Sequence, residues 1–311
     1  MPFDFRAVTA PFRMQPGLRR LDHSGPTLTP NDLDARALAA KLAVLRDHPE
    51  RALLAQPGFD DRAVVHTLSR QASLDAPDAL RWDGARAWRA ERLGWSVVDG
   101  RVIGDGPEPI GACLRSLPEA WRATALLALA FEEDVAAIDA ATATIPWLAV
   151  CLPSHWAPEH KLGLHFAQVH APVADGQMLR AAGAHLAALV CGTQRWERFV
   201  WSITPHAALC LHPLAVSGPG WHDPDSAQRT LAQAHWRTEH QTFLPTGAGQ
   251  AVFTIHVDTC PLAQALTSAE QALQLRDALA SMSPAVLAYR GLTAPRAVLL
   301  DWLAHWPAPP P

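Results

Sequence analysis

Apolar residues recur at helical spacing in the first half of the chain. After Asn31, which suits the N-cap of a helix, leucines repeat at nearly helical spacing until Pro49 ends the pattern. The same spacing covers about 60–73 and 117–142, and the second of these stretches is rich in alanine and leucine. The pattern predicts a mainly helical region up to residue 144.

The pattern changes near residue 145, where a short apolar run bounded by prolines indicates a buried strand. A helix is then predicted between Pro158 and Pro172, because the first proline suits a first turn and the second cannot continue a helix. Another helix is expected over about 176–191.

Strand-like segments follow, rich in β-branched and aromatic residues that partly alternate with polar ones. They cover 195–204, 235–245 and 250–260, and the short turn TGAG joins the last two. An antiparallel sheet is the expected product. Helices are predicted after it, at about 267–281 and 294–305.

This order of elements predicts an α+β fold in a single domain over residues 1–311, since no repeat or linker interrupts it. The expected parts are an extended surface arm at 1–30, a mainly helical region at 31–144, a sheet core at 145–262 and C-terminal helices at 263–306.

Composition narrows the class of protein. With 311 residues, 49% of them hydrophobic, the chain can bury a sizeable core. A net charge of −4 gives no basic field for nucleic acid, and no apolar run suggests a membrane span or a signal peptide, so a soluble cytoplasmic protein is expected. The five cysteines are scattered, which favours neither a disulfide framework nor a zinc site.

Histidines stand five residues apart at His155, His160, His165 and His170. Five residues turn a helix by about 500°, so neighbours in this series point roughly 140° apart and do not form one metal site. On a helical wheel His160 falls opposite the apolar stripe, whereas His165 and His170 flank it. Either could face a buried cofactor, although a structural role is the simpler interpretation on this context alone.

His170 has one further property, because it falls in the last turn of the predicted helix. Carbonyl groups there lack partners within the helix. One of them could accept the Nδ1–H of His170 and direct its Nε2 toward a metal.

Polar residues also alternate along the strand-like segments. Arg237, Glu239 and Gln241 share one face, which is either solvated or a polar cluster in a pocket. On the preceding segment, regular alternation places Arg198 and Trp201 on opposite faces.

The acidic cluster Glu132-Glu133-Asp134 falls inside the predicted helix 117–142, where a solvated edge is the expected place for charges. No G-x-S-x-G, P-loop or G-x-G-x-x-G motif occurs in the chain. Hydrolase, nucleotide-binding and dehydrogenase functions therefore have no positive support.

Taken in order, several segments resemble one family, the haem-dependent oxidative N-demethylase α-subunit family. They are PFRMQPGLRRLD, FEED, CLPSHWAPEHKLG, VHAPV, RWERFVWSIT, WRTEHQTFLP and AVFTIHVD, which together span nearly the whole chain. The most specific part is PSHW-x-P-x-x-KLG followed by VHAPV. The resemblance implies a PAS-like fold that binds haem b and uses O₂ to oxidise a small secondary amine, such as dimethylamine, to methylamine and formaldehyde.

The same resemblance implies roles for individual residues. His170 would be the iron ligand, with His165 as the alternative. The distal candidates are Arg198, Trp201, Arg237 and Glu239. An arginine would stabilise developing negative charge, Glu239 would hold the ammonium group and tryptophan would add cation–π contact. Lys161 or Arg195 would pair with the haem propionates.

The chain has no flavin or nicotinamide motif and no four closely spaced cysteines for a plant-type [2Fe–2S] cluster. A separate reductase is therefore expected. The resemblance implies partner subunits that carry FMN, a [2Fe–2S] cluster and a tetrahydrofolate site for formaldehyde.

Three positions depart from the family pattern, which has Asn at Val200, Arg at His240 and a further proline at Ala174. A departure that reaches the pocket would change the amine or the reaction. The rival functions are a non-catalytic haem sensor or carrier and a cofactor-free binding protein with structural histidines. A mononuclear metal hydrolase would need convergent ligands that the histidine spacing does not provide.

Overall fold

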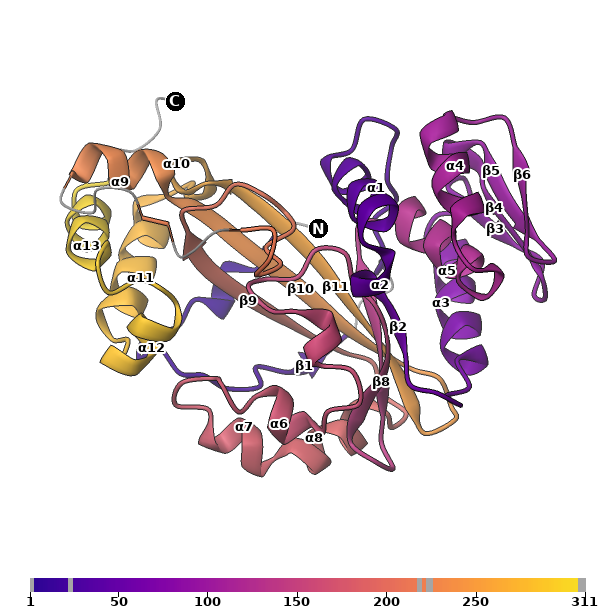
Figure 1. The fold of residues 1–311 in the computed structure, drawn as a ribbon. Coiled ribbons are helices and arrows are strands. Elements are labelled where there is room, and N and C mark those ends of the chain that lie inside the picture. Colours follow the sequence, from indigo (N-terminus) through magenta and orange to yellow (C-terminus); the bar gives the residue numbers. More distant parts are fainter. Residues whose placement is uncertain (1–2, 22–24, 217–219, 222–225, 307–311) are drawn as a thin grey trace.

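The computed structural model describes residues 3–21, 25–216, 220–221 and 226–306. It contains a seven-stranded sheet in the order β1-β9-β10-β11-β7-β8-β2 and a four-stranded sheet in the order β3-β4-β5-β6, with helices packed around them. Figure 1 shows the large sheet at the centre, with the C-terminal helices on one side and the small sheet on the other. The predicted α+β class is confirmed.

The three longest strands lie side by side in the large sheet and confirm the strand predictions. Their bounds are β9 (Trp196–Thr204), β10 (His235–Pro245) and β11 (Gln250–Pro261). Every neighbouring pair is antiparallel. The other strands of this sheet are β1 (Arg19–Arg20), β2 (Leu53–Ala55), β7 (Asp134–Asp139) and β8 (Thr144–Ala149).

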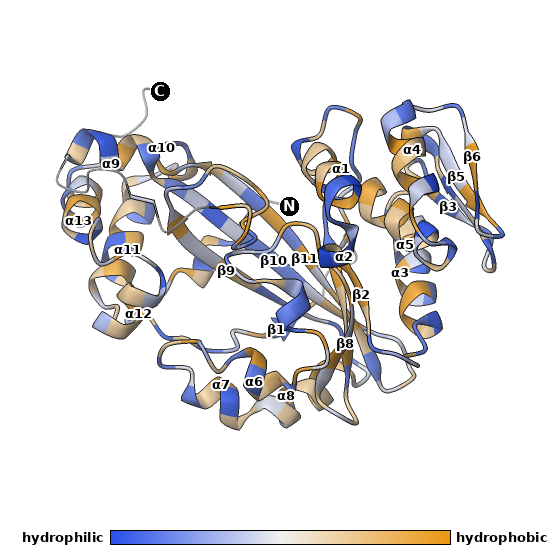
Figure 2. Ribbon diagram, viewed as in Figure 1, coloured by the Kyte–Doolittle hydropathy of each residue, from blue (hydrophilic) through white to orange (hydrophobic). Residues whose placement is uncertain are grey.

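Register in the large sheet sorts side chains onto two faces. Arg198 lies opposite Gln241 and Val200 lies opposite Glu239, and directly opposed residues share a face. We call this side the cavity face. The other side, which carries Trp201 and residues paired with it, is called the core face. Figure 2 shows hydrophilic and hydrophobic residues interleaved along β9 to β11.

The helix predicted over 117–142 is wrong in its second half. Helix α5 (Glu119–Ala130) ends before the acidic cluster, and the alanine-rich stretch that follows is strand β7. It lies between β11 and β8, so its backbone groups pair on both edges. Tertiary pairing therefore overrides the helical propensity of alanine.

The acidic cluster is also not a solvated edge, contrary to the prediction. Glu133 and Asp134 are 2% and 1% exposed. The Nζ of fully buried Lys41 lies 3.2 Å from Asp134 Oδ1, and His256 Nε2 lies 2.6 Å from Glu132 Oε2. Helix α5 ends before the cluster, and the chain then enters the sheet, so the acidic side chains are buried beside partners that compensate their charge.

The first helix begins later than predicted. Helix α1 (Arg36–Asp47) follows Ala35, so Asn31 is not its N-cap. Asn31 is buried, and its Nδ2 donates to the carbonyl oxygen of Leu129 at 3.0 Å. The side chain therefore ties the incoming segment to α5. A short helix, α2 (Pro49–Ala52), begins at the proline predicted to end the pattern.

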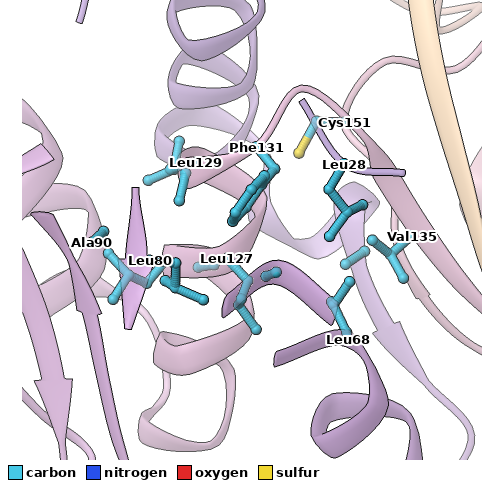
Figure 3. Packing of buried hydrophobic residues seen from close by; sticks show 14 of the residues in the cluster. Leu28, Leu68, Leu80, Ala90, Leu127, Leu129, Phe131, Val135 and Cys151 are labelled. Atoms are coloured by element: carbon cyan, nitrogen blue, oxygen red, sulfur yellow. The ribbon is translucent and has the colours of Figure 1, made fainter. Parts of the chain in front are cut away.

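A small sheet that the sequence pattern did not predict packs on α3 (Arg62–Asp75), α4 (Glu108–Ser116) and α5. Its strands are β3 (Leu80–Trp82), β4 (Ala87–Ala90), β5 (Trp95–Val98) and β6 (Arg101–Gly104), with a 3-10 turn η2 (Glu91–Leu93). Figure 3 shows Leu80 and Ala90 of this sheet in one buried cluster with Leu127 of α5 and Leu68 of α3. The strands were missed because they are too short to show clear alternation.

The helix predicted between Pro158 and Pro172 is broken, so the helical wheel does not apply to it. A 3-10 turn, η3 (Pro158–His160), is separated from α6 (Phe166–Val169) by Gly163, whose φ is +72°. This left-handed backbone favours glycine, and His165 then forms a bridge with Thr144. The helix predicted at 176–191 forms as α7 (Gln177–Ala181) and α8 (Gly183–Val190).

Helices cover both faces of the large sheet. Residues of α8 pack against Phe243 and Ile138 on the cavity face, whereas the C-terminal helices pack around Trp201 and Trp236 on the core face. These helices are α9 (Ala227–Gln233), α10 (Leu262–Ala265), α11 (Ala269–Ala280), α12 (Pro284–Tyr289) and α13 (Arg296–Ala304). Within the described residues, no helix is long and apolar enough to cross a membrane.

The N-terminal arm is extended apart from a 3-10 turn, η1 (Phe5–Ala7). Val8 is fully buried against the C-terminal helices, and Phe12 N donates to Ser281 Oγ at 2.9 Å. Farther along, Arg19 Nε donates to Glu197 Oε1 at 2.8 Å where β1 joins the sheet. The arm therefore follows the edge of the sheet and is fastened at both ends.

Candidate functional site

A cavity of about 940 Å³ lies between the cavity face, helices α6 and α7 and the N-terminal arm. This volume is in the upper part of the range for pockets that hold a cofactor or substrate. Much of its wall is apolar, including Ile138, Ile145, Val169, Leu179 and Phe253. The sequence-predicted residues on the wall are Lys161, His170, Arg198, Trp201, Arg237 and Glu239.

His170 stands at the C-cap of α6. Its Nδ1 lies 2.9 Å from the carbonyl oxygen of Phe166, and its ring stacks on the Phe166 ring with centroids 4.1 Å apart. Burial lowers the pKa of His170, which favours the neutral ring. Nδ1–H then donates to the carbonyl, and Nε2 keeps a lone pair to which no described residue donates.

Of the other histidines in the five-residue series, His155 lines the cavity together with His170, whereas His160 and His165 do not. His165 does not line the cavity, and its Nδ1 accepts from the backbone N–H of Ala167 at 3.1 Å as the cap of α6. His160 is exposed, as predicted, although it lies in the 3-10 turn η3 and not on the helix from which the prediction was made. No group of three or more His, Cys, Asp or Glu residues in the described parts of the chain could hold a metal ion. A ligand that needs one histidine fits this arrangement better than a bare metal.

Arg198 projects from β9 on the cavity face. Burial lowers the pKa of its guanidinium, whereas the nearby Glu239 charge acts in the opposite direction. The positive charge of Arg198 also contributes to the lowered pKa of His170, so the two groups act on one region of the cavity. Arg198 makes no hydrogen bond with any residue that the structure describes, and its donors are free for a ligand.

Arg237 behaves differently, although it stands on the same face. It is 1% exposed. Its Nη2 donates to Leu209 O at 2.8 Å, its Nη1 donates to Ala208 O at 3.1 Å, and its Nε donates to Ser154 Oγ at 2.9 Å. These contacts hold two loops against β10. The guanidinium is therefore occupied by protein groups and contributes a wall of the cavity.

Glu239 is held in place by two donors. Ser154 Oγ donates to Oε1 at 2.5 Å, and Gln241 Nε2 donates to Oε2 at 2.5 Å. The carboxylate keeps further lone pairs for a cation in the cavity. Ser154 was missed by the sequence reasoning, although it belongs to the segment PSHW that carried the resemblance.

Trp201 does not share a wall with Glu239, because alternation turns it to the core face. Its ring stacks on Trp236 with centroids 5.2 Å apart and meets Phe12 edge-on at 5.6 Å. It lines the cavity beside Phe12 of the N-terminal arm. Contact with an amine held by Glu239 is thus not supported by its position.

The two residues predicted to pair with the haem propionates, Lys161 and Arg195, differ in their position relative to the cavity. Lys161 lines the cavity, where its Nζ donates to Val169 O at 3.0 Å and burial lowers its pKa. Arg195 is not among the residues that line the cavity.

One of the three departures from the family pattern reaches the cavity. Val200 lines it directly opposite Glu239 in the register, whereas His240 and Ala174 do not line it. His240 lies on the core face, with its Nε2 2.7 Å from Glu197 Oε2.

The charge on the wall is unbalanced. Glu239 is the acidic residue among the described cavity-lining side chains, against the cations Arg13, Lys161, Arg198, Arg237 and Arg290. Arg6 and Arg19 also line the cavity, but they pair with the carboxylates of Asp4 and Glu197. Such a cavity favours a ligand that carries negative charge.

The model of the family described as haem-dependent oxidative N-demethylase, alpha subunit-like, matches residues 115–300. The chain belongs to this family. No curated protein matches the chain significantly. Within this haem-dependent family, the matched residues include the three long strands and α6 to α8, and hence most of the cavity. The N-terminal arm and the small sheet lie outside the match.

The cavity of this N-demethylase family member fits a haem on three counts. His170 offers a neutral Nε2, and the hydrogen bond from its Nδ1 to Phe166 O fixes the orientation of the ring. Apolar side chains such as Ile138, Val169 and Phe253 suit the faces of a planar macrocycle. Cationic side chains suit its two carboxylates.

Proposed function

We propose that this chain is the haem-binding subunit of an oxidative N-demethylase, in which His170 Nε2 binds the iron of haem b. The observation that carries the proposal is the hydrogen bond from His170 Nδ1 to Phe166 O, which leaves Nε2 available in a cavity that also contains a free arginine. His165 is less suitable because its Nδ1 is engaged in capping α6.

The substrate class follows from Glu239. Its carboxylate, oriented by Ser154 and Gln241, would accept a hydrogen bond from the ammonium form of a small secondary amine. Val200 lies opposite Glu239 and would contact an alkyl group of that amine. A dimethylamine-like substrate satisfies both residues.

Arg198 would stabilise negative charge that develops during the reaction, because its donors are not used by the protein. Arg237 would support it indirectly by holding Ser154. The haem, when bound, supplies O₂-dependent oxidation, in which RNHCH₃, O₂, two electrons and two protons give RNH₂, CH₂O and H₂O.

The electrons would come from partner subunits, since the chain has no motif for a flavin or an iron–sulfur cluster. Partners that carry FMN, a [2Fe–2S] cluster and a tetrahydrofolate site for formaldehyde are consistent with an alpha subunit-like chain.

The visible spectrum of the purified protein tests this function. A Soret band that shifts with dithionite, and shifts again with dimethylamine, is the expected result. A Soret band that does not respond to any amine would instead favour a haem sensor or carrier. Absence of haem binding, even after reconstitution with hemin, would contradict the proposal and favour a cofactor-free protein.

A further inference from the structure

Arg290 lines the cavity directly after α12, beside Trp201 of β9. Its guanidinium carbon is 4.6 Å from the centre of the Phe12 ring and 5.2 Å from that of Trp201. Its Nη1 donates to Trp201 O at 2.6 Å. Two aromatic rings and one carbonyl thus fix the plane of this arginine.

The positive charge of Arg290 is not balanced by the protein. Its Nε is buried and has no hydrogen-bond partner among the described residues. Its Nη2 meets only the sulfur of Met14, a weak acceptor, at 3.9 Å. Burial lowers the pKa of Arg290 to about 10, and no carboxylate in the described residues pairs with it. A buried cation without a counter-charge is costly unless a ligand supplies one.

Such a ligand can bind on the side of the Arg290 guanidinium that carries Nε and Nη2. Nε and Nη2 form a two-donor fork, and an arginine fork matches the two oxygens of a carboxylate. Met14 stands at this fork and itself lines the cavity. A flexible thioether can move aside when a stronger acceptor enters.

We infer that Arg290, with Phe12, Met14 and Trp201, forms a carboxylate-binding subsite in the wall of the cavity. The inference rests on the proposed function, because the carboxylate belongs to a molecule held in the cavity. It is either a haem propionate or the carboxylate of an N-methyl amino acid that is the amine substrate. Both sources present the same group to the fork, and separate experiments distinguish them.

The propionate is tested by titrating apo-protein with hemin and with hemin dimethyl ester, followed by the Soret band. Wild-type protein should bind hemin more tightly than hemin dimethyl ester. Arg290→Gln should reduce this ratio of affinities about tenfold, the usual scale for a charge-assisted hydrogen bond. Arg276→Gln is the matched control, because Arg276 pairs with Asp277 outside the cavity. Its preference should equal that of wild type.

The substrate carboxylate is tested on the haem-loaded protein with N-methylglycine and dimethylamine. If the substrate is the source, Arg290→Gln weakens the spectral response to N-methylglycine about tenfold and leaves that to dimethylamine unchanged. The hemin preference is then the same in variant and wild type.

A second variant supplies the missing anion without removing Arg290. Met14→Glu places a carboxylate at the fork, so the apo-protein should melt about 2 °C or more above Met14→Gln. Because the new carboxylate occupies the fork, the preference for a ligand that carries a carboxylate should fall. If Met14→Glu gives no gain over Met14→Gln, or if Arg290→Gln folds and changes neither preference, the subsite is overturned. Failure of the proposed function looks different, since wild-type protein would then bind no haem.

Discussion

The two faces of the large sheet carry similar polar residues but differ in how these residues are satisfied. On the core face, the side chains of His240 and Glu197 lie 2.7 Å apart and bond to each other. On the cavity face, Glu239 is fixed by neighbouring donors, but Arg198 has no partner in the described part of the chain. The strands are the same, and only the alternation of side chains separates the two environments.

This difference shows where a ligand is expected. Polar groups buried without partners are costly, and a folded protein tolerates them mainly where a bound molecule completes them. On the core face, His240 and Glu197 satisfy each other, as do Thr242 and Thr254, so these polar residues serve stability. On the cavity face Arg198 has no partner among the described residues, and across the cavity Nε2 of His170 has none, so these two groups serve binding.

The largest effect should come from removing His170, the proposed iron ligand, which lines the cavity. His170→Ala should lower haem affinity by more than about 100-fold. Losing the iron ligand should cost more than losing a group that only hydrogen-bonds to a ligand, for which the cost is roughly 10–100-fold. The Soret band of the reconstituted protein measures this. His165→Ala is the control and should keep its haem; loss of the band in His165→Ala alone would reverse the ligand assignment.

The next effect concerns the fixed carboxylate. Glu239→Gln should retain haem and lower kcat/KM for the amine about 100-fold, because the neutral amide no longer holds an ammonium group. Amine-dependent formaldehyde formation with a suitable reductant measures the change. Asp258→Asn, an exposed carboxylate on the core face of β11, should leave turnover unaltered. Equal turnover in Glu239→Gln would remove Glu239 from the site.

A third experiment compares the two arginines of the cavity face. Arg237→Met should cost about 3 kcal/mol or more of unfolding free energy, because it leaves the carbonyls of Leu209 and Ala208 buried without donors. Arg198→Met should cost little in the apo-protein, since no protein partner is lost. Urea denaturation measures both. Similar losses would mean that Arg198 also has partners within the protein and is not free for a ligand.

The smallest effect is a pH dependence on the core face. Burial lowers the pKa of His240 below its usual 6.5 despite the nearby Glu197 carboxylate, so the unfolded chain takes up a proton before the folded protein does. Stability should therefore fall as the pH drops below 6.5, by at most about 1.4 kcal/mol per unit for this residue.

The variant His240→Gln isolates that contribution. Its stability should depend less steeply on pH than that of wild type between about pH 6.5 and 5. His155, whose pKa burial lowers to about 4, acts in the same direction but is common to both proteins and cancels. Parallel pH curves for the two proteins would show that His240 is not buried in its neutral form.

Alternation along the chain was sufficient to predict part of the site. The segments 195–204, 235–245 and 250–260 form strands at nearly these bounds, because a period of two is a local property of the sequence. The same alternation separated Trp201 from Arg198, and the register between β9 and β10 then separated Trp201 from Glu239. It could not show which face would be covered and which would border a cavity.

The sequence by itself thus determined the strands, several helices, the family resemblance and the set of residues on each strand face. Only the tertiary structure decided that 134–139 is a strand, because pairing on two edges outweighs helical propensity. It also decided that the guanidinium of Arg237 donates to carbonyl groups, whereas Arg198 has no partner among the described residues and Arg290 keeps its Nε without one. Such partners are contributed by segments far apart in the chain, and no local pattern encodes them.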